Sequence, residues 1–136
     1  MYAARTSALV KQIIRTDAAP IPRIAASQAT RFGNLVFTQG LTPRDPVAGD
    51  LVNTDIRSAS RIVFSNLRAI LGAAGSSLDN VLQLRCYIRD FDNDFPGWNE
   101  VFIEFFPSNW PARTVVPAPL GEGFRLEVDA IAAVTE

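Results

Sequence analysis

Near its C-terminus the chain alternates strictly between two kinds of side chain, and this pattern constrains the fold most. From Leu126 to Val134 one set of alternate residues is entirely apolar, whereas the other set begins with Glu127 and Asp129. Successive side chains of a β-strand point to opposite faces of the sheet. We therefore expect a strand with one buried face and one face that mixes charge with hydrocarbon.

The preceding segments alternate between strand and helix patterns. Gly33-Asn34 separates two short apolar runs and predicts a β-hairpin. Asn53 or Thr54 is expected to cap a helix that runs to about Ala73, because apolar residues recur there at helical spacing. An aromatic-rich helix is expected over 96–106. The predicted strands span 11–15, 27–32, 35–38, 81–88, 115–116 and 126–134.

This order, β-β-β-α-β-α-β-β, predicts an α+β layer in which two helices cover one face of a mixed sheet. In the strand over 81–88 one set of alternate residues is apolar: Leu82, Leu84, Cys86 and Ile88. The other set is mixed: Val81, Gln83, Arg85 and Tyr87. A solvated face is usually more uniformly polar, so we expect another subunit to cover it. An exposed amphipathic face is the alternative.

The length of 136 residues fits one domain. Residues 1–10 are weakly patterned and are expected to be an N-terminal extension, so that 11–136 form the domain. No apolar run approaches 18 residues, and the N-terminus lacks an unbroken apolar segment. We therefore expect a cytoplasmic protein with no membrane partner.

Several kinds of chemistry are excluded by residues that the chain lacks. It contains no histidine, which rules out Ser-His and Cys-His pairs and His-ligated zinc. Cys86 is the single cysteine and lies in an apolar run, which predicts a buried, inert thiol. The net charge of −1 argues against a nucleic-acid partner. We expect neither a metal nor a cofactor.

Arg113 opens an apolar run and is the first candidate for chemistry. A guanidinium can hold a substrate carboxylate through two parallel hydrogen bonds, and a nearby acidic residue such as Asp129 can hold or deprotonate a water. Together they suit hydrolysis of a small organic acid. The structural alternatives are an intersubunit ion pair from Arg113 to Glu127 or Asp129, and a purely structural ion pair of Asp129.

At this point the chain resembles a known family. The segments that carry the resemblance are Phe32 to Gly40, the helix over 53–75, Pro111-Ala112-Arg113 and Leu126-Glu127-Val128. They are similar to the YjgF/YER057c/UK114 family, also called the Rid (reactive intermediate deaminase) family, over about residues 11 to 134. The resemblance implies a chorismate-mutase-like α+β fold. It also implies a homotrimer, a trimeric barrel with three sites between subunits.

The resemblance further implies roles for individual residues. Arg113 matches the arginine that binds the substrate carboxylate, and Asn99 matches an asparagine near the pocket. Asp129 falls where deaminating members usually carry the glutamate that positions the attacking water. Asn99 has a structural alternative, since it could be a helix residue bonded to a neighbouring loop. Glu127 lies roughly 7 Å from Asp129 on the same face, and two like charges there could raise one pKa.

The chain also departs from the family pattern. Ala26 stands where the pocket tyrosine would be, Gln39 replaces a common serine, and Val115 stands where a cysteine is frequent. The predicted substrate-binding residues are Arg113, Asn99, Gln39, Val115 and Glu127. The altered pocket suits a substrate larger or differently shaped than 2-aminoacrylate.

The expected function is hydrolytic deamination of small enamine or imine intermediates that bear a carboxylate, giving keto acids and ammonia. One alternative is a specialised deaminase of an aminomuconate-like catabolic intermediate. The other is a non-catalytic trimer that binds small acids.

Overall fold

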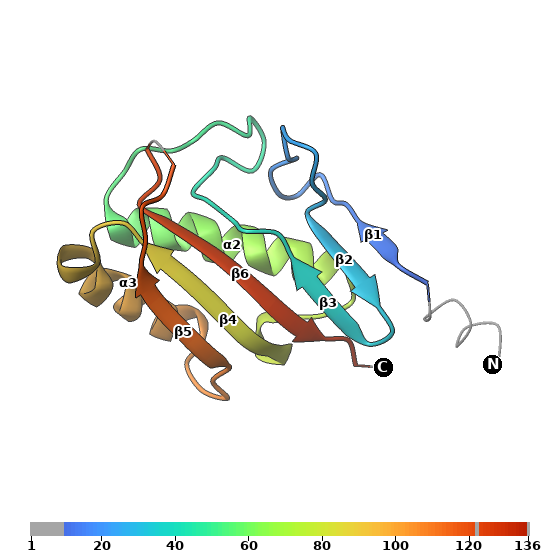
Figure 1. The fold of residues 1–136 in the computed structure, drawn as a ribbon. Helices are drawn as coiled ribbons and strands as arrows, with labels where there is room; N and C mark the ends of the chain where they lie inside the picture. The colour runs from blue at the N-terminus through green and yellow to red at the C-terminus, as the bar shows by residue number, and fades with distance from the viewer. Residues whose placement is uncertain (1–9, 122, 136) are drawn as a thin grey trace.

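The described residues form one six-stranded mixed sheet with two helices on one of its faces, as Figure 1 shows. The computed structural model describes residues 10–121 and 123–135, so the predicted extension over 1–10 lies outside them apart from Val10. The helices are α2 (Ile56–Ala73) and α3 (Phe91–Phe105), and the 3-10 turn η1 (Leu78–Asn80) precedes the fourth strand. The strands are β1 (Gln12–Ile14), β2 (Ala29–Phe32), β3 (Leu35–Thr38), β4 (Val81–Ile88), β5 (Ala112–Pro117) and β6 (Leu126–Ala133). The predicted order of elements is confirmed.

The strand that alternates most strictly lies inside the sheet. The spatial order is β1-β2-β3-β6-β4-β5, and only β4 and β5 run parallel, because α3 carries the chain from one to the other. In β6 every second residue is buried beneath the helices, from Leu126 to Ala132. Glu127 and Asp129 lie on the opposite face, which no helix covers (Figure 1). We call this uncovered side the open face.

The first helix begins one or two residues later than expected. Its cap is Asp55 rather than Asn53 or Thr54, because the Asp55 carboxylate accepts hydrogen bonds from the backbone N–H and the hydroxyl of Ser58, both at 2.9 Å. A carboxylate that accepts from the third helical N–H satisfies one of the free donors at the helix start. The helix ends at Ala73 as predicted.

The second helix begins at Phe91, five residues before the predicted start at Pro96. Proline lacks the N–H of an interior helix bond, so it is more typical of a first turn. In this chain Pro96 instead lies inside the helix, and aromatic contacts accompany the additional turn before it. Phe91 and Phe95 lie one turn apart, and their rings stack with 5.0 Å between the centroids. The ring of Phe95 also contacts that of the buried Trp98.

The strand β4 departs from the predicted alternation at its start. A bulge between Val81 and Gln83 makes Leu82 an extra residue in the pairing with β6. Val81 is therefore buried, whereas Leu82 is 49% exposed. The remaining alternation holds, with Leu84, Cys86 and Ile88 on the covered face.

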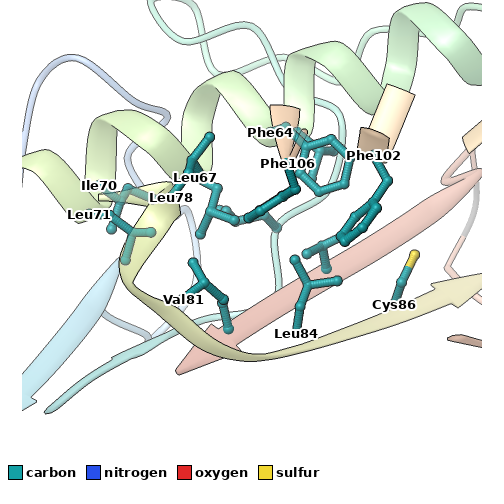
Figure 2. Close-up of a cluster of buried hydrophobic side chains, with 14 of the residues drawn as sticks. Phe64, Leu67, Ile70, Leu71, Leu78, Val81, Leu84, Cys86, Phe102 and Phe106 are labelled. Carbon is teal, nitrogen blue, oxygen red and sulfur yellow. The ribbon is translucent and has the colours of Figure 1, made fainter. Parts of the chain in front are cut away.

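The core fills the space between the sheet and the helices (Figure 2). Phe64 of α2 lies at its centre, with the rings of Phe102 and Phe106 6.2 and 5.7 Å away. Cys86 is fully buried among these side chains, and burial raises the pKa of its thiol well above the usual range. The predicted burial of this thiol is confirmed.

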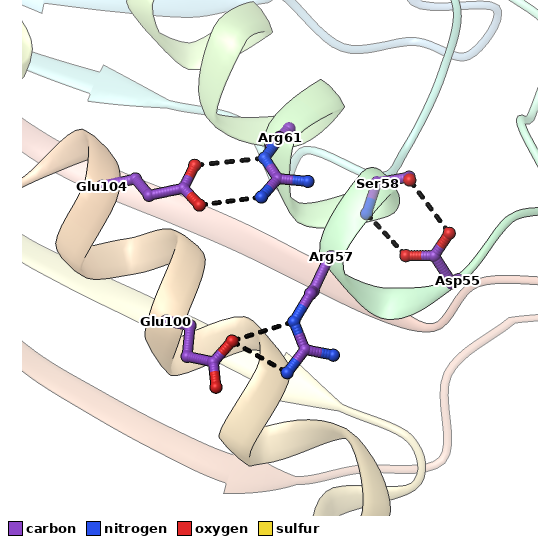
Figure 3. A network of polar contacts seen from close by, with 6 residues as sticks. All are labelled: Asp55, Arg57, Ser58, Arg61, Glu100 and Glu104. Carbon is purple, nitrogen blue, oxygen red and sulfur yellow. Dashed lines mark hydrogen bonds and ion pairs between the residues drawn. The ribbon is translucent and has the colours of Figure 1, made fainter.

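Two ion pairs join the helices on their solvent side (Figure 3). Arg57 and Arg61 of α2 bind Glu100 and Glu104 of α3, with shortest N–O distances of 2.8 and 2.7 Å. Such exposed pairs contribute about 1 kcal/mol or less each. Neither helix within the described residues is long and apolar enough to cross a membrane.

Candidate functional site

Arg113 and Asn99, two predicted site residues, are in direct contact. The strand β5 starts at Ala112, earlier than the predicted 115–116, and its pairing places Arg113 beside Leu84 of β4. Paired residues of adjacent strands share a face of the sheet, so Arg113 points to the side of the helices. There its Nη1 donates a hydrogen bond of 2.7 Å to Oδ1 of Asn99 on α3.

Aromatic rings of α3 form a wall against the Arg113 guanidinium. Its central carbon lies 4.6 Å from the ring centroid of Phe102 and 5.3 Å from that of Trp98. Partial burial lowers the pKa of Arg113, but a guanidinium remains charged under all ordinary conditions. No carboxylate among residues 10–121 and 123–135 forms an ion pair with it. Its other N–H groups are therefore available to an anion.

Asp129 is engaged by a residue of the neighbouring strand. Arg85 of β4 lies directly opposite it in the register with β6, and Nε of Arg85 is 2.8 Å from Oδ1 of Asp129. The Asp129 side chain is only 16% exposed. The structural ion pair considered for Asp129 therefore exists, and its partner is Arg85.

Glu127 lies at a cavity of about 440 Å³ next to the open face. Among the hydrogen bonds and ion pairs of the described residues, none involves its half-buried carboxylate. Gly40 lies directly beneath that carboxylate, and a Cβ at position 40 would overlap Oε2 and come within 2.8 Å of Cδ. Burial raises the pKa of Glu127, and the negative charge of Asp129 raises it further.

Other predicted positions separate into two groups. Gln39 and Ala26 line the same cavity as Glu127. Val115 does not, because it pairs with Cys86 and packs against the core on the covered face. The cavity also holds residues that the sequence did not single out, notably Arg23, Arg44 and Phe124. They come from loops, and no spacing in the sequence indicated that these loops meet.

Within one copy, Arg113 and Glu127 cannot act on the same small molecule. In the sheet, Arg113 of β5 is paired with Leu84 of β4, and Glu127 of β6 is paired with Tyr87 of β4. This offset separates their backbones by about 10 Å along the strands and about 10 Å across them. Their side chains also lie on opposite faces, since Leu84 is buried beneath the helices and Tyr87 is on the open face.

No group of three His, Cys, Asp or Glu side chains suitable for a metal ion occurs within the described residues.

The layered architecture defines a chorismate-mutase-like α+β protein, and solved structures share it closely. Yeast Mmf1 matches with a TM-score of 0.88 and 30% identity, covering 93% of this chain and 100% of the other. Escherichia coli TdcF, solved with bound serine, matches with a TM-score of 0.84 and 33% identity over 91% of this chain and 99% of its own.

The sequence model of the endoribonuclease L-PSP family matches residues 16–134. The chain belongs to this family, which is the YjgF/Rid family. A RutC family protein of Pyrococcus horikoshii is 41% identical over 124 residues, 90% of this chain and 98% of that protein. The 2-iminobutanoate/2-iminopropanoate deaminase of Dermatophagoides farinae is 37% identical, over 91% of this chain and 97% of its own. The human protein of the same name is 33% identical, over 93% of this chain and 92% of its own.

Proposed function

We propose that this protein hydrolyses small imines and enamines that bear a carboxylate, releasing a keto acid and ammonia. The observation that carries the proposal is a pair of charged groups, the Arg113 guanidinium and the Glu127 carboxylate, neither of which forms an ion pair among the described residues. The first suits a substrate carboxylate and the second suits a water. Two relatives with the name 2-iminobutanoate/2-iminopropanoate deaminase support the same chemistry.

The proposal requires that copies of the chain associate, because Arg113 and Glu127 of one copy lie too far apart. We propose a homotrimer in which Arg113 and Asn99 of one copy face Glu127 and Gln39 of the next. The open face supports this assembly because it exposes apolar residues. Phe37 is 41% exposed and Val116 36%, and Ile131 is paired with Phe37. Apolar area of this kind beside polar groups is typical of a subunit interface.

The reaction follows from the groups that would meet there. Arg113 binds the substrate carboxylate, and Asn99 holds the guanidinium in place. Water held by Glu127 forms a bond to the imine carbon, while the electron pair of the C=N bond moves to nitrogen. Glu127 takes a proton from the water and returns it to nitrogen. Glu127 then takes the hydroxyl proton and passes it to the NH2 group, the C–N bond breaks as the carbonyl forms, and ammonia leaves a keto acid. Such positioning can supply several kcal/mol of the barrier, up to about 7–11 kcal/mol.

We assign the water to Glu127 and not to Asp129, where it was expected from the family pattern. Asp129 is held by Arg85, whereas the Glu127 carboxylate has no partner among the described residues and faces the cavity. Burial and the charge of Asp129 raise the pKa of Glu127 towards neutral pH, which suits a group that accepts a proton from water. Asp129 then serves as a positioning residue that raises the basicity of its neighbour.

A specialised substrate is the second candidate. Ala26 lines the cavity with only a methyl group, and this leaves space for a substrate larger than 2-aminoacrylate. An aminomuconate-like intermediate would be one such molecule.

The test is ammonia release from freshly generated 2-aminoacrylate and 2-iminobutanoate by wild type and Arg113→Ala. We expect rapid release by the wild type and a loss of at least 100-fold in kcat/KM in the variant. Arg57→Ala is the matched control, because Arg57 lies in the exposed ion pair between the helices. If the wild type does not accelerate ammonia release from either compound, the proposed deaminase function is contradicted.

A further inference from the structure

The cavity beside Glu127 contains two arginines that the proposed reaction does not use. Arg23 binds Asp50 at 2.9 Å and the backbone oxygen of Ala48 at 2.8 Å, so its charge is largely neutralised. Arg44 is different. Its Nη1 donates to the backbone oxygen of Gly49 at 3.0 Å, and no carboxylate among the described residues forms an ion pair with it.

Arg44 is held firmly although it lies in a loop. The buried Asn66 of α2 donates a hydrogen bond of 2.9 Å from Nδ2 to the backbone oxygen of Arg44. Arg44 also forms a backbone bridge with Leu51. Its guanidinium lies 5.5 Å from the ring centroid of Phe124, which lines the same cavity. A cation fixed in this way loses little conformational entropy when it binds an anion.

A substrate with one carboxylate needs only one arginine to bind it, whereas the proposed site has both Arg44 and Arg113. Arg113 takes the carboxylate next to the imine, which leaves Arg44 without a function on 2-aminoacrylate. Glu127 would repel a second negative group that entered the cavity, and neither Arg23 nor Arg44 forms an ion pair with Glu127 in the described part of the chain. The half-buried guanidinium of Arg44, which forms no ion pair among residues 10–121 and 123–135, offsets this repulsion.

We propose that Arg44 forms a subsite for a second anionic group and that the preferred substrate is an imine or enamine of a dicarboxylic acid. This inference rests on the proposed deaminase function. The α-carboxylate is bound by Arg113 of a neighbouring copy, the imine carbon lies near Glu127, and the distal carboxylate is bound by Arg44. The cavity of about 440 Å³, with only a methyl group at Ala26, accommodates the longer acid.

The experiment compares deamination of 2-iminoglutarate and 2-iminobutanoate, each generated in situ by an amino acid oxidase with catalase present. The readout is the ratio of kcat/KM for the dicarboxylic imine to that for the monocarboxylic one. We expect wild type to favour 2-iminoglutarate and Arg44→Gln to lower the ratio roughly tenfold, the effect of one charge-assisted hydrogen bond. Arg44→Lys, which keeps the charge, should recover part of the ratio. Arg61→Gln, which alters only an exposed helix pair, should leave the ratio unchanged.

The outcomes separate the subsite from the deaminase. Turnover of 2-iminobutanoate with a ratio that Arg44→Gln changes less than about twofold overturns the subsite and leaves the deaminase standing. If neither imine is turned over, the proposed function fails, and calorimetric binding of 2-oxoglutarate and 2-oxobutanoate decides the subsite. Arg44→Gln that binds 2-oxoglutarate more weakly than wild type does, but binds 2-oxobutanoate equally well, supports the subsite. If the affinity for each acid is the same in wild type and variant, the subsite is overturned. Thermal melting of each variant checks that it is folded.

Discussion

Arg85 and Asp129 stand directly opposite each other on adjacent strands and form an ion pair at 2.8 Å. This pair explains why two carboxylates on one face of the last strand have different environments. Asp129 is paired with Arg85 across the strands. Glu127, two residues earlier, projects into the cavity with no partner among the described residues.

Glu127→Gln should remove more activity than Asp129→Asn. Loss of the group that accepts the water's proton costs on the order of 100-fold or more in kcat, while loss of a positioning charge costs about tenfold. Steady-state ammonia release measures both, and circular dichroism confirms that both are folded. If Asp129→Asn is as severe as Glu127→Gln in a folded protein, Asp129 is the proton acceptor and our assignment is wrong.

The acidic limb of the activity profile should lie above the ordinary pKa of a glutamic acid. Burial and the charge of Asp129 both raise the pKa of Glu127, so its active, ionised form is lost at a higher pH than usual. Asp129→Asn removes one negative charge and should move the limb to lower pH. Arg85→Gln removes the cation that offsets Asp129 and should move it to higher pH. Shifts of the same sign in both variants would rule out this electrostatic account.

Gly40→Ala should damage activity without unfolding the protein. The new Cβ would overlap the end of the Glu127 side chain, which is flexible and can swing away at little cost. We expect a fall of roughly tenfold or more in kcat with a melting temperature close to that of wild type, since a displacement of about 1 Å is enough to disrupt catalysis. Full activity in Gly40→Ala would mean that the position of this carboxylate is unimportant.

Gly97→Ala should instead destabilise the fold. Its Cβ would lie 2.8 Å from Cγ2 of Ile56, where α3 approaches α2 closely. Overpacking of this kind costs about 1–3 kcal/mol in the free energy of unfolding. Gly72→Ala is the matched control, because it lies in α2 with nothing within 4 Å of the new Cβ and should stabilise by about 0.5–1 kcal/mol. Urea denaturation compares the two, and an equal effect would refute the steric explanation.

Phe37→Arg should dissociate the proposed trimer and remove activity with it. Phe37 is 41% exposed on the open face and pairs with Ile131, so a charge there would be buried without a partner at an interface. Sedimentation measures the molar mass of the variant, and circular dichroism shows whether it is folded. A folded trimer that contains this arginine would show that the interface lies elsewhere.

Alternation and family pattern predicted much of this arrangement. The strict period of two in β6 correctly placed Glu127 and Asp129 on one face and the apolar residues beneath the helices. The resemblance implied that Arg113 and Asn99 both belong to the pocket, but it did not predict the hydrogen bond between them. The choice between the two carboxylates could not be predicted, because it depends on which β4 residue faces Asp129. That register is set by pairing and by the bulge after Val81.

Other features depend on distant segments and left no local signal. Pro96 indicated a helix start, but stacking of Phe91 on Phe95 extended the helix beyond it. Arg44 lies in a segment that reads as an ordinary loop. Its place at the cavity comes from Asn66 on α2, 22 residues further along the chain.

The most direct test of the central claim mixes two inactive variants, Arg113→Ala and Glu127→Gln. A site that takes Arg113 from one copy and Glu127 from the next is intact wherever an Arg113→Ala copy supplies Glu127 to an adjoining Glu127→Gln copy. After unfolding and refolding together in equal amounts, random trimers should recover about a quarter of the wild-type ammonia release. No recovery, with mixed trimers demonstrated by mass spectrometry, would show that the two residues do not serve one shared site.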